Sequence, residues 1–247
     1  MMNAFPRPQR NRWRLLLAVL ALGAAPVYAQ EKSVRPGINK QYENPDIKAS
    51  QSILETEGRE AFAKRNEILA ACRLKPGMTV ADIGAGTGIF TRTFAAQVGP
   101  TGRVYAVDIA RNFIEHIQKT SREAGLTNVT GVICTPTSTE LPPNSIDLAF
   151  ISDTYHHFEY PQKTMASIHR ALRPGGQLVL VEYRRIEGKT PDWLMKHIRA
   201  GQEVFTKEIE AAGFRIVPQA DFLKDNYFVR FEKVEPSAHR PGSVPPR

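Results

Sequence analysis

The sequence predicts an α/β protein built on a doubly wound, mostly parallel sheet, and three observations support this fold class. Short apolar strands alternate with helical segments from about residue 80 onward. The first strand, 80–83, runs directly into a turn that carries glycines at alternate positions. Several of the expected strands end at an acidic residue, and open parallel sheets bind their ligands at the carboxyl ends of the strands.

The first 29 residues have the pattern of a secretory signal peptide. Arginines up to Arg14 precede an apolar run over 15–25, and Val27-Tyr28-Ala29 resembles a small-residue cleavage site. The uncharged run is short of the roughly 20 apolar residues that a membrane span needs. We therefore expect export to the periplasm with no stable membrane insertion after cleavage. The alternative is an uncleaved segment that holds the protein at the inner membrane.

The remaining chain predicts one enzyme-sized domain. Residues 30–50 form a polar lead-in, 51–235 the folded domain, and 236–247 a Pro/Ser/Arg-rich tail that we expect to be disordered. The formal charge of +8 includes four arginines before residue 15, so the rest is only mildly basic and nucleic acid is not an expected partner. Cys72 and Cys134 have no metal-site spacing and are expected to be small buried residues, so no metal is predicted.

Hydrophobic patterning and turn residues define each element in order. The expected helices are 51–72, broken in two at Gly58, then 89–98, 110–124, 161–172, a short one within 188–199, and 202–212. The expected strands are 80–83, 103–108, 128–134, 146–152, 177–182, 214–217 and 227–233. Residues 173–176, Arg-Pro-Gly-Gly, are expected to form the turn before the fifth strand.

The glycine turn argues for a nucleotide-type ligand without a pyrophosphate. Its glycines, Gly84, Gly86 and Gly88, have the spacing G-x-G-x-G, whereas a dinucleotide fingerprint requires G-x-G-x-x-G. Asp82 stands two residues before the first glycine, where a carboxylate would repel a pyrophosphate but would suit an amino group. Both features disfavour a nicotinamide-dependent oxidoreductase.

Four motifs occur in order and together resemble the class I S-adenosylmethionine-dependent methyltransferases. They are 80–88, 105–108, 141–148 and 172–178. The resemblance covers about 59–231 and is nearest to the small-molecule enzymes of the ubiquinone-biosynthesis type. It implies a Rossmann-like methyltransferase fold with a seven-stranded sheet whose last two strands are antiparallel. It also implies S-adenosylmethionine as the cofactor and a small molecule as the methyl acceptor.

The resemblance also implies a set of cofactor-binding residues. Asp108 would bind the ribose hydroxyls, with an N-cap of the next helix as a second possible role, and Ile109 would pack on the adenine. Many family members carry an Asp before the Leu-Pro of the 141–148 motif, whereas this chain has Thr137 or Ser138 there. The full predicted set is Asp82, Gly84, Ala85, Gly86, Gly88, Asp108, Ile109, Thr137 and Asp153.

The acceptor is expected at the ends of the fourth and fifth strands. His156 and His157 follow the fourth strand, and either is a candidate base near neutral pH. We expect adjacent histidines not to face inward together, and the alternative is that both only shape the loop. Tyr155 and Phe158 are expected to form an apolar wall. The predicted function is methyl transfer to a small molecule; the alternative is an exported, non-catalytic binding protein on the same fold.

Overall fold

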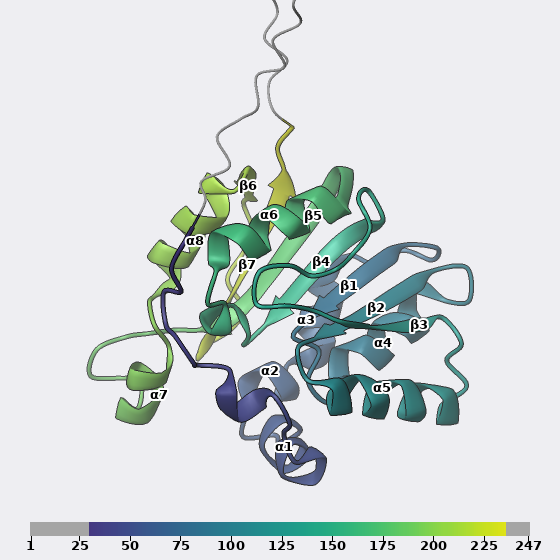
Figure 1. The fold of residues 1–247 in the computed structure, drawn as a ribbon, viewed down its shortest axis with the longest axis horizontal. Helices are drawn as coiled ribbons and strands as arrows, with labels where there is room; N and C mark the ends of the chain where they lie inside the picture. Colours follow the sequence, from purple (N-terminus) through teal and green to yellow (C-terminus); the bar gives the residue numbers. More distant parts are fainter. Residues whose placement is uncertain (1–29, 236–247) are drawn as a thin grey trace, which may run out of the picture.

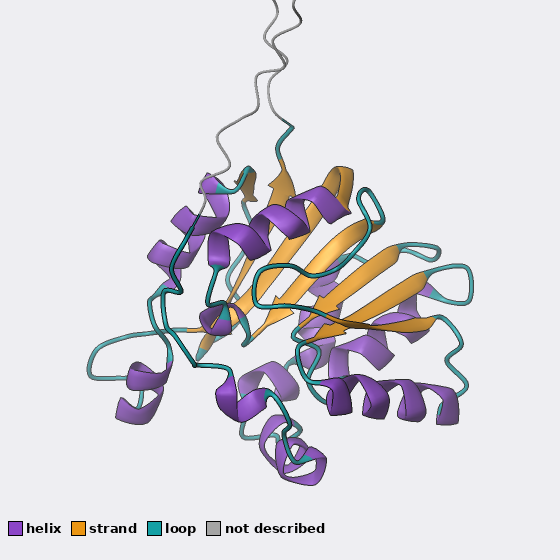
Figure 2. Cartoon of the chain, in the orientation of Figure 1, coloured by secondary structure: helices purple, strands orange, loops and turns teal. Residues whose placement is uncertain are grey.

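A computed structural model describes residues 30–235, and this part forms one sheet with helices on both faces (Figures 1 and 2). The strands are β1 (Thr79–Ile83), β2 (Arg103–Asp108), β3 (Val129–Ile133), β4 (Ile146–Ser152), β5 (Leu172–Tyr183), β6 (Phe214–Val217) and β7 (Asn226–Lys233). The predicted signal peptide and C-terminal tail lie outside the described residues. Within 30–235, no helix is long and apolar enough to cross a membrane.

The sheet confirms the predicted fold class. Its strand order is β3-β2-β1-β4-β5-β7-β6. The first five strands run parallel, and β7 is antiparallel to both β5 and β6. The chain starts in the middle of the sheet, winds outward to β3 and then returns to β4. This reversal between β1 and β4 is the switch point at which open α/β sheets bind their ligands.

Helices cover both faces of the sheet because its central strands are apolar on both sides. They are α1 (Ile47–Leu54), α2 (Glu60–Ala63), α3 (Arg65–Cys72), α4 (Ile89–Val98), α5 (Arg111–Glu123), α6 (Pro161–Ala171), α7 (Asp192–His197) and α8 (Gln202–Ala211), with short 3-10 helices η1 (Lys40–Tyr42) and η2 (Tyr155–His157). Within β1, Val80 packs with α3 and α4. Its neighbours Ala81 and Ile83 pack with α6 and α8, as the two-residue repeat of a strand requires.

The N-terminal helical region differs from its prediction. It begins earlier, at Ile47, because Asp46 caps α1 by accepting a hydrogen bond from the Ala49 amide at 2.7 Å. It is also broken twice, so α1, α2 and α3 replace the expected two pieces. Figure 1 shows α1, α2 and α7 gathered at the edge to which the parallel strands point.

The predicted turn at 173–176 lies inside β5 instead of before it. Ile146 of β4 pairs with Leu172, and Leu148 pairs with Gln177, so four residues of β5, 173–176, stand against the single residue Asp147 of β4. The Arg-Pro-Gly-Gly segment is therefore a bulge that keeps the strand in the sheet on both sides of it. Gly175 has φ +74°, which permits this bend.

The predicted lead-in is bound to the domain by several hydrogen bonds. The Val34 amide donates to the Glu159 carbonyl at 2.9 Å, and Ser33 Oγ donates to the Glu159 carboxylate at 2.9 Å. Arg35 donates to the carbonyls of Lys196 and His197 at the end of α7. We call residues 30–39 the N-terminal strap. It connects the loop after η2 with α7 across the surface.

Candidate active site

A cavity of about 1100 Å³ opens at the carboxyl ends of the parallel strands. Its walls come from the glycine turn after β1, the ends of β2, β4 and β5, and the helices α1 and α7. The switch point between β1 and β4 therefore lies at its floor. A cavity of this size can hold a cofactor and a second small molecule, since typical ligand sites measure about 300–1000 Å³.

The glycine turn presents bare main chain to this cavity. The Gly84 and Ala85 amides donate to the Val107 carbonyl at 2.8 and 3.1 Å, which ties the turn to β2. Gly84 has φ +72°, and a Cβ there would lie 2.2 Å from Cγ2 of Thr154. Only glycine fits between the turn and the loop after β4. The close approach of these two segments shapes the cavity floor.

Asp82 is a buried carboxylate at the start of this turn. Its Oδ2 accepts a hydrogen bond from Thr91 Oγ1 of α4 at 2.6 Å. Burial, helped by the nearby Asp108 carboxylate, raises the pKa of Asp82 to about 7. Among the described residues no basic side chain forms an ion pair with it, so a cationic group of a ligand would find an unneutralised partner there.

Asp108 ends β2 and connects three segments. Its Oδ2 accepts from the Gly86 amide and its Oδ1 from the Ala110 amide, both at 2.9 Å. Burial raises the pKa of Asp108, although these amide hydrogen bonds oppose the shift. The N-cap role is wrong, because α5 begins at Arg111 and its N-cap residue is Ala110. Asp108 is held at the cavity wall with its carboxylate in a fixed orientation.

The predicted cofactor residues are mostly, but not all, on the cavity wall. Those that line the cavity are Asp82, Gly84, Ala85, Gly86, Asp108, Ile109 and Asp153. Gly88 does not line it and serves as the N-cap residue of α4, with φ +81°. Thr137 does not line it either, whereas Ser138, the other hydroxyl considered for the adenine amine, does.

Asp153 has protein partners for both of its carboxylate oxygens. Arg59 donates to Oδ2 from Nη2 at 2.6 Å, and Asn226 donates to Oδ1 at 2.7 Å. Asp153 therefore joins the loop after β4 to the segment before α2 and to the start of β7. Next to Arg59, Glu60 accepts hydrogen bonds from three successive backbone amides, 224–226, at 2.7 Å each. The sequence pattern did not indicate these roles for Arg59 and Glu60.

His156 and His157 both line the cavity, so the expectation that adjacent histidines diverge is wrong. Both residues lie on η2, and the centroids of their two imidazole rings are 4.2 Å apart. The 3-10 turn brings both rings to the side that faces α7. There they meet His197, which the sequence pattern did not indicate because its short helix carries no motif and lies 40 residues further along the chain.

Of the two residues expected to form an apolar wall, only Phe158 lines the cavity. Tyr155 points into the core, where its ring packs 4.9 Å from that of Phe205 and 5.0 Å from that of Phe158. Phe158 does line the cavity. The remaining apolar lining comes from helices for which no site role was predicted, above all Ile53 of α1 and Trp193 and Leu194 of α7.

The architecture and the glycine turn define the class: this is a protein with the class I methyltransferase fold. Residues 81–180 match the family described as "Methyltransferase domain". This part of the chain is therefore similar to a methyltransferase domain, which agrees with the resemblance stated from the motifs.

Three comparisons describe the similarity. The chain is 33% identical over 114 residues to the ubiquinone/menaquinone biosynthesis C-methyltransferase UbiE of Hydrogenovibrio crunogenus, covering 46% of this chain and 45% of that protein. It is 26% identical over 166 residues to the Bordetella avium protein of the same name, covering 64% of each. The chain thus spans less than two thirds of these relatives. A S-adenosylmethionine-dependent methyltransferase from Aquifex aeolicus has a similar fold, with TM-score 0.68, 24% identity and coverage of 77% of this chain and all of that one.

Proposed function

We propose that this protein transfers the methyl group of S-adenosylmethionine to a small-molecule acceptor. The observation that carries the proposal is the pair of buried carboxylates, Asp82 and Asp108, on either side of a bare glycine turn. The cofactor has an amino-acid end with an ammonium group, a ribose with two hydroxyls, and no phosphate. One carboxylate for each of these features is what its recognition requires.

Each cofactor contact has a candidate residue. Asp82 would bind the ammonium group, Asp108 the ribose hydroxyls, and Ile109 the adenine face. The backbone of 84–86 would lie against the amino-acid end, because all three residues line the cavity and none carries more than a methyl side chain. Ser138 is better placed than Thr137 to meet the adenine amine, since it lines the cavity. Asp153 would contribute indirectly, by holding the loop after β4 beside Gly84.

The chemistry is an in-line displacement at the sulfonium methyl carbon. The acceptor atom forms a bond to this carbon while the carbon–sulfur bond breaks, and its electron pair stays on the neutral sulfur. The leaving group needs no acid, so the protein mainly aligns the two reactants. A hydroxyl acceptor must also lose a proton, and His156 or His157 would assist this step from the acceptor side.

The acceptor would be a small molecule with an apolar body. The cavity walls beyond the cofactor residues include Ile53, Phe158 and Trp193. Trp193 is two-thirds exposed on α7, where a bound acceptor would cover it. The relatives named for ubiquinone and menaquinone biosynthesis agree with an acceptor of this polarity. We also propose that nucleic acid is not a partner, because the chain after residue 29 is only mildly basic.

The proposal is tested by methyl transfer. Purified protein is incubated with S-adenosylmethionine labelled in its methyl group and with extracts of its own host, and labelled small molecules are separated by chromatography. We expect label in an apolar product and none with Asp108→Ala. Cofactor binding without any transfer would instead favour the non-catalytic binding protein, which an exported chain could be because the cofactor is made in the cytoplasm.

We also propose that the protein is exported to the periplasm. The support is the basic, apolar and small-residue pattern over residues 1–29. Cell fractionation followed by mass spectrometry of the intact chain tests it. We expect a periplasmic protein that begins at Gln30. A protein found in the inner membrane with residues 1–29 attached would support the uncleaved anchor, and a cytoplasmic location would contradict export.

A further inference from the structure

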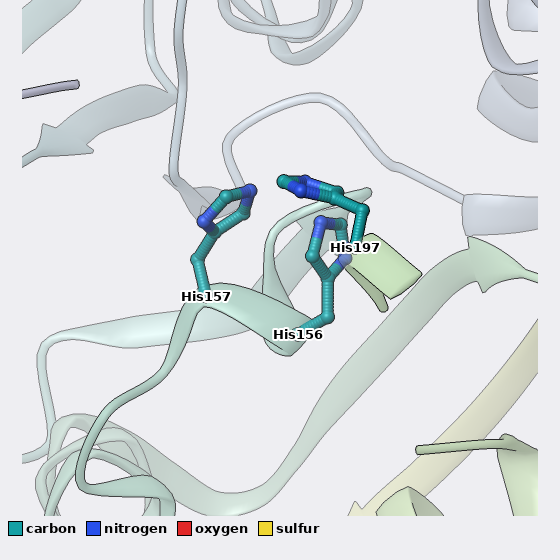
Figure 3. Close-up of side chains that lie close together, drawn as sticks. All are labelled: His156, His157 and His197. Atoms are coloured by element: carbon teal, nitrogen blue, oxygen red, sulfur yellow. The ribbon is translucent and has the colours of Figure 1, made fainter. Parts of the chain in front are cut away.

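Three imidazole rings meet at the acceptor side of the cavity (Figure 3). His156 and His157 come from η2, and His197 comes from the end of α7. The ring centroid of His197 lies 4.9 Å from that of His156 and 5.0 Å from that of His157. One ring nitrogen of each residue lies within 4.8 Å of those of the other two. We call these residues the three-histidine cluster.

His156 has a fixed tautomer. Its Nδ1 lies 2.8 Å from Oε2 of Glu182, a fully buried residue at the end of β5. Glu182 also accepts hydrogen bonds from the amides of His156 and Tyr183, so both of its carboxyl oxygens act as acceptors. Nδ1 therefore carries the proton and donates it, and Nε2 keeps a free lone pair. A carboxylate behind a histidine in this way is the usual support of a metal-binding imidazole.

The free nitrogens of the cluster have no hydrogen-bond partners in the described structure. His156 Nε2 and His157 Nδ1 are both buried and unpaired. Burying such a polar atom without a partner is unfavourable, so most buried polar atoms have one. Burial, with help from the two neighbouring histidines, lowers the pKa of His157 and keeps its ring neutral. The unpaired nitrogens of His156 and His157 are therefore open to a ligand beside the His197 ring.

The charges around the cluster are balanced. Arg35 of the N-terminal strap donates a hydrogen bond to the carbonyl of His197. Its positive charge lowers the pKa of His197 and also disfavours a bound cation at this place. Glu182 lies on the other side, in contact with His156, and its negative charge offsets that of Arg35. The strap also holds His157 through a hydrogen bond from Asn39 Nδ2 to the His157 carbonyl at 3.0 Å. Both backbone segments that carry the cluster are thus fixed from the same side.

We propose that His156, His157 and His197 bind one divalent transition-metal ion, with zinc the best match. Neutral imidazoles suit zinc and its neighbours, whereas magnesium and calcium require oxygen ligands. Zinc–nitrogen bonds of about 2.0–2.1 Å place tetrahedral ligand atoms about 3.3 Å apart, so the rings need to close by an ångström or so. Three protein ligands leave a fourth position open toward the cavity, as in catalytic zinc sites.

The open position gives the ion a role at the acceptor. This role rests on the proposed methyl transfer. A hydroxyl acceptor bound to the ion would lose its proton to solvent more readily, because a bound cation lowers the pKa of a coordinated hydroxyl. The resulting oxygen anion would then attack the methyl carbon. In this arrangement His156 and His157 hold the ion and are not the base.

Metal binding can be measured without any cofactor or activity. The full protein is purified without a histidine tag, dialysed against chelator, and titrated with Co²⁺ while its visible absorption is followed. Zinc affinity is then measured by competition with a chromophoric chelator. We expect one equivalent of either metal. His197→Ala should weaken zinc binding at least about 100-fold, and Glu182→Gln about 10- to 100-fold at unchanged stoichiometry.

The control is His169→Ala, which removes a histidine of α6 that is bonded to the Val234 carbonyl outside the cavity. It should bind zinc as the unchanged protein does. His197 is only half-buried, so its variant should fold, and circular dichroism checks this. Failure of the unchanged protein to bind stoichiometric metal, or equal affinity in folded His197→Ala, would overturn the site. Methyl transfer by metal-free protein would overturn the ion's role alone, and metal binding without transfer would support the site while rejecting the proposed function.

Discussion

At the scale of single residues, Asp82 couples the cofactor site to pH. Its carboxyl is buried, accepts a hydrogen bond from Thr91 and lies near a second acid, so protonation is favoured until about pH 7. An ammonium group requires the ionised form. Ligand binding must therefore remove a proton from Asp82 at acidic pH, and this costs free energy.

This coupling predicts a pH-dependent affinity. The affinity for S-adenosylhomocysteine should rise as the pH increases from about 6 to about 8 and level off above the pKa, because below it the proton must first leave. Calorimetry in buffers of different ionisation enthalpy measures both the affinity and the released proton. Asp82→Asn should bind weakly and with a flatter profile. Glu123→Gln, at an exposed acid of α5, serves as the control, and an unchanged profile in Asp82→Asn would contradict the assignment.

At the scale of elements, the glycine turn and the loop after β4 depend on each other. Gly84 approaches Thr154 so closely that a methyl group cannot be added, and Asp153 anchors the same loop through Arg59 and Asn226. The loop leads directly into η2 and its two histidines. The cofactor side and the acceptor side of the cavity are therefore joined by one short segment, 153–157.

Replacement of Gly84 by alanine tests this dependence. Gly84→Ala should lower the free energy of unfolding by more than the roughly 1–2 kcal/mol expected for a positive φ alone, because the added Cβ also meets Thr154. Gly125→Ala is the matched control, since Gly125 has φ +71° and nothing within 4 Å of its added Cβ. Urea unfolding compares the two. Equal losses would show that the contact with Thr154 does not matter.

The same scale explains what the sequence could predict. The strands were predictable because each is a short apolar run between turn residues, as in 103–108 and 146–152, and their positions agree with the structure. The turn at 173–176 was misplaced because a bulge and a turn use the same residues, and only pairing with β4 distinguishes them. The break between α1 and α2 was predicted from Gly58, whereas the second break, at Lys64 between α2 and α3, was not predicted.

At the scale of the whole molecule, the residues on the cofactor side of the site could be predicted from the sequence, whereas those on the acceptor side could be predicted only in part. Asp82, Gly84 and Asp108 lie within 27 residues that fold as strand, turn, helix and strand, so their neighbourhood was predictable. The acceptor half combines the N-terminal strap, η2 and α7, which are far apart in the chain. His197 could be found only once the fold had brought these segments together.

The central claim is that this cavity binds the methyl donor through Asp82, Asp108 and the glycine turn. Calorimetric titration of the purified protein with S-adenosylhomocysteine tests it most directly. We predict one site with a micromolar dissociation constant, weakened about tenfold or more by Asp108→Ala, a loss of about 1.4 kcal/mol or more. No binding by the unchanged protein, or equal binding by a folded Asp108→Ala variant, would contradict the claim.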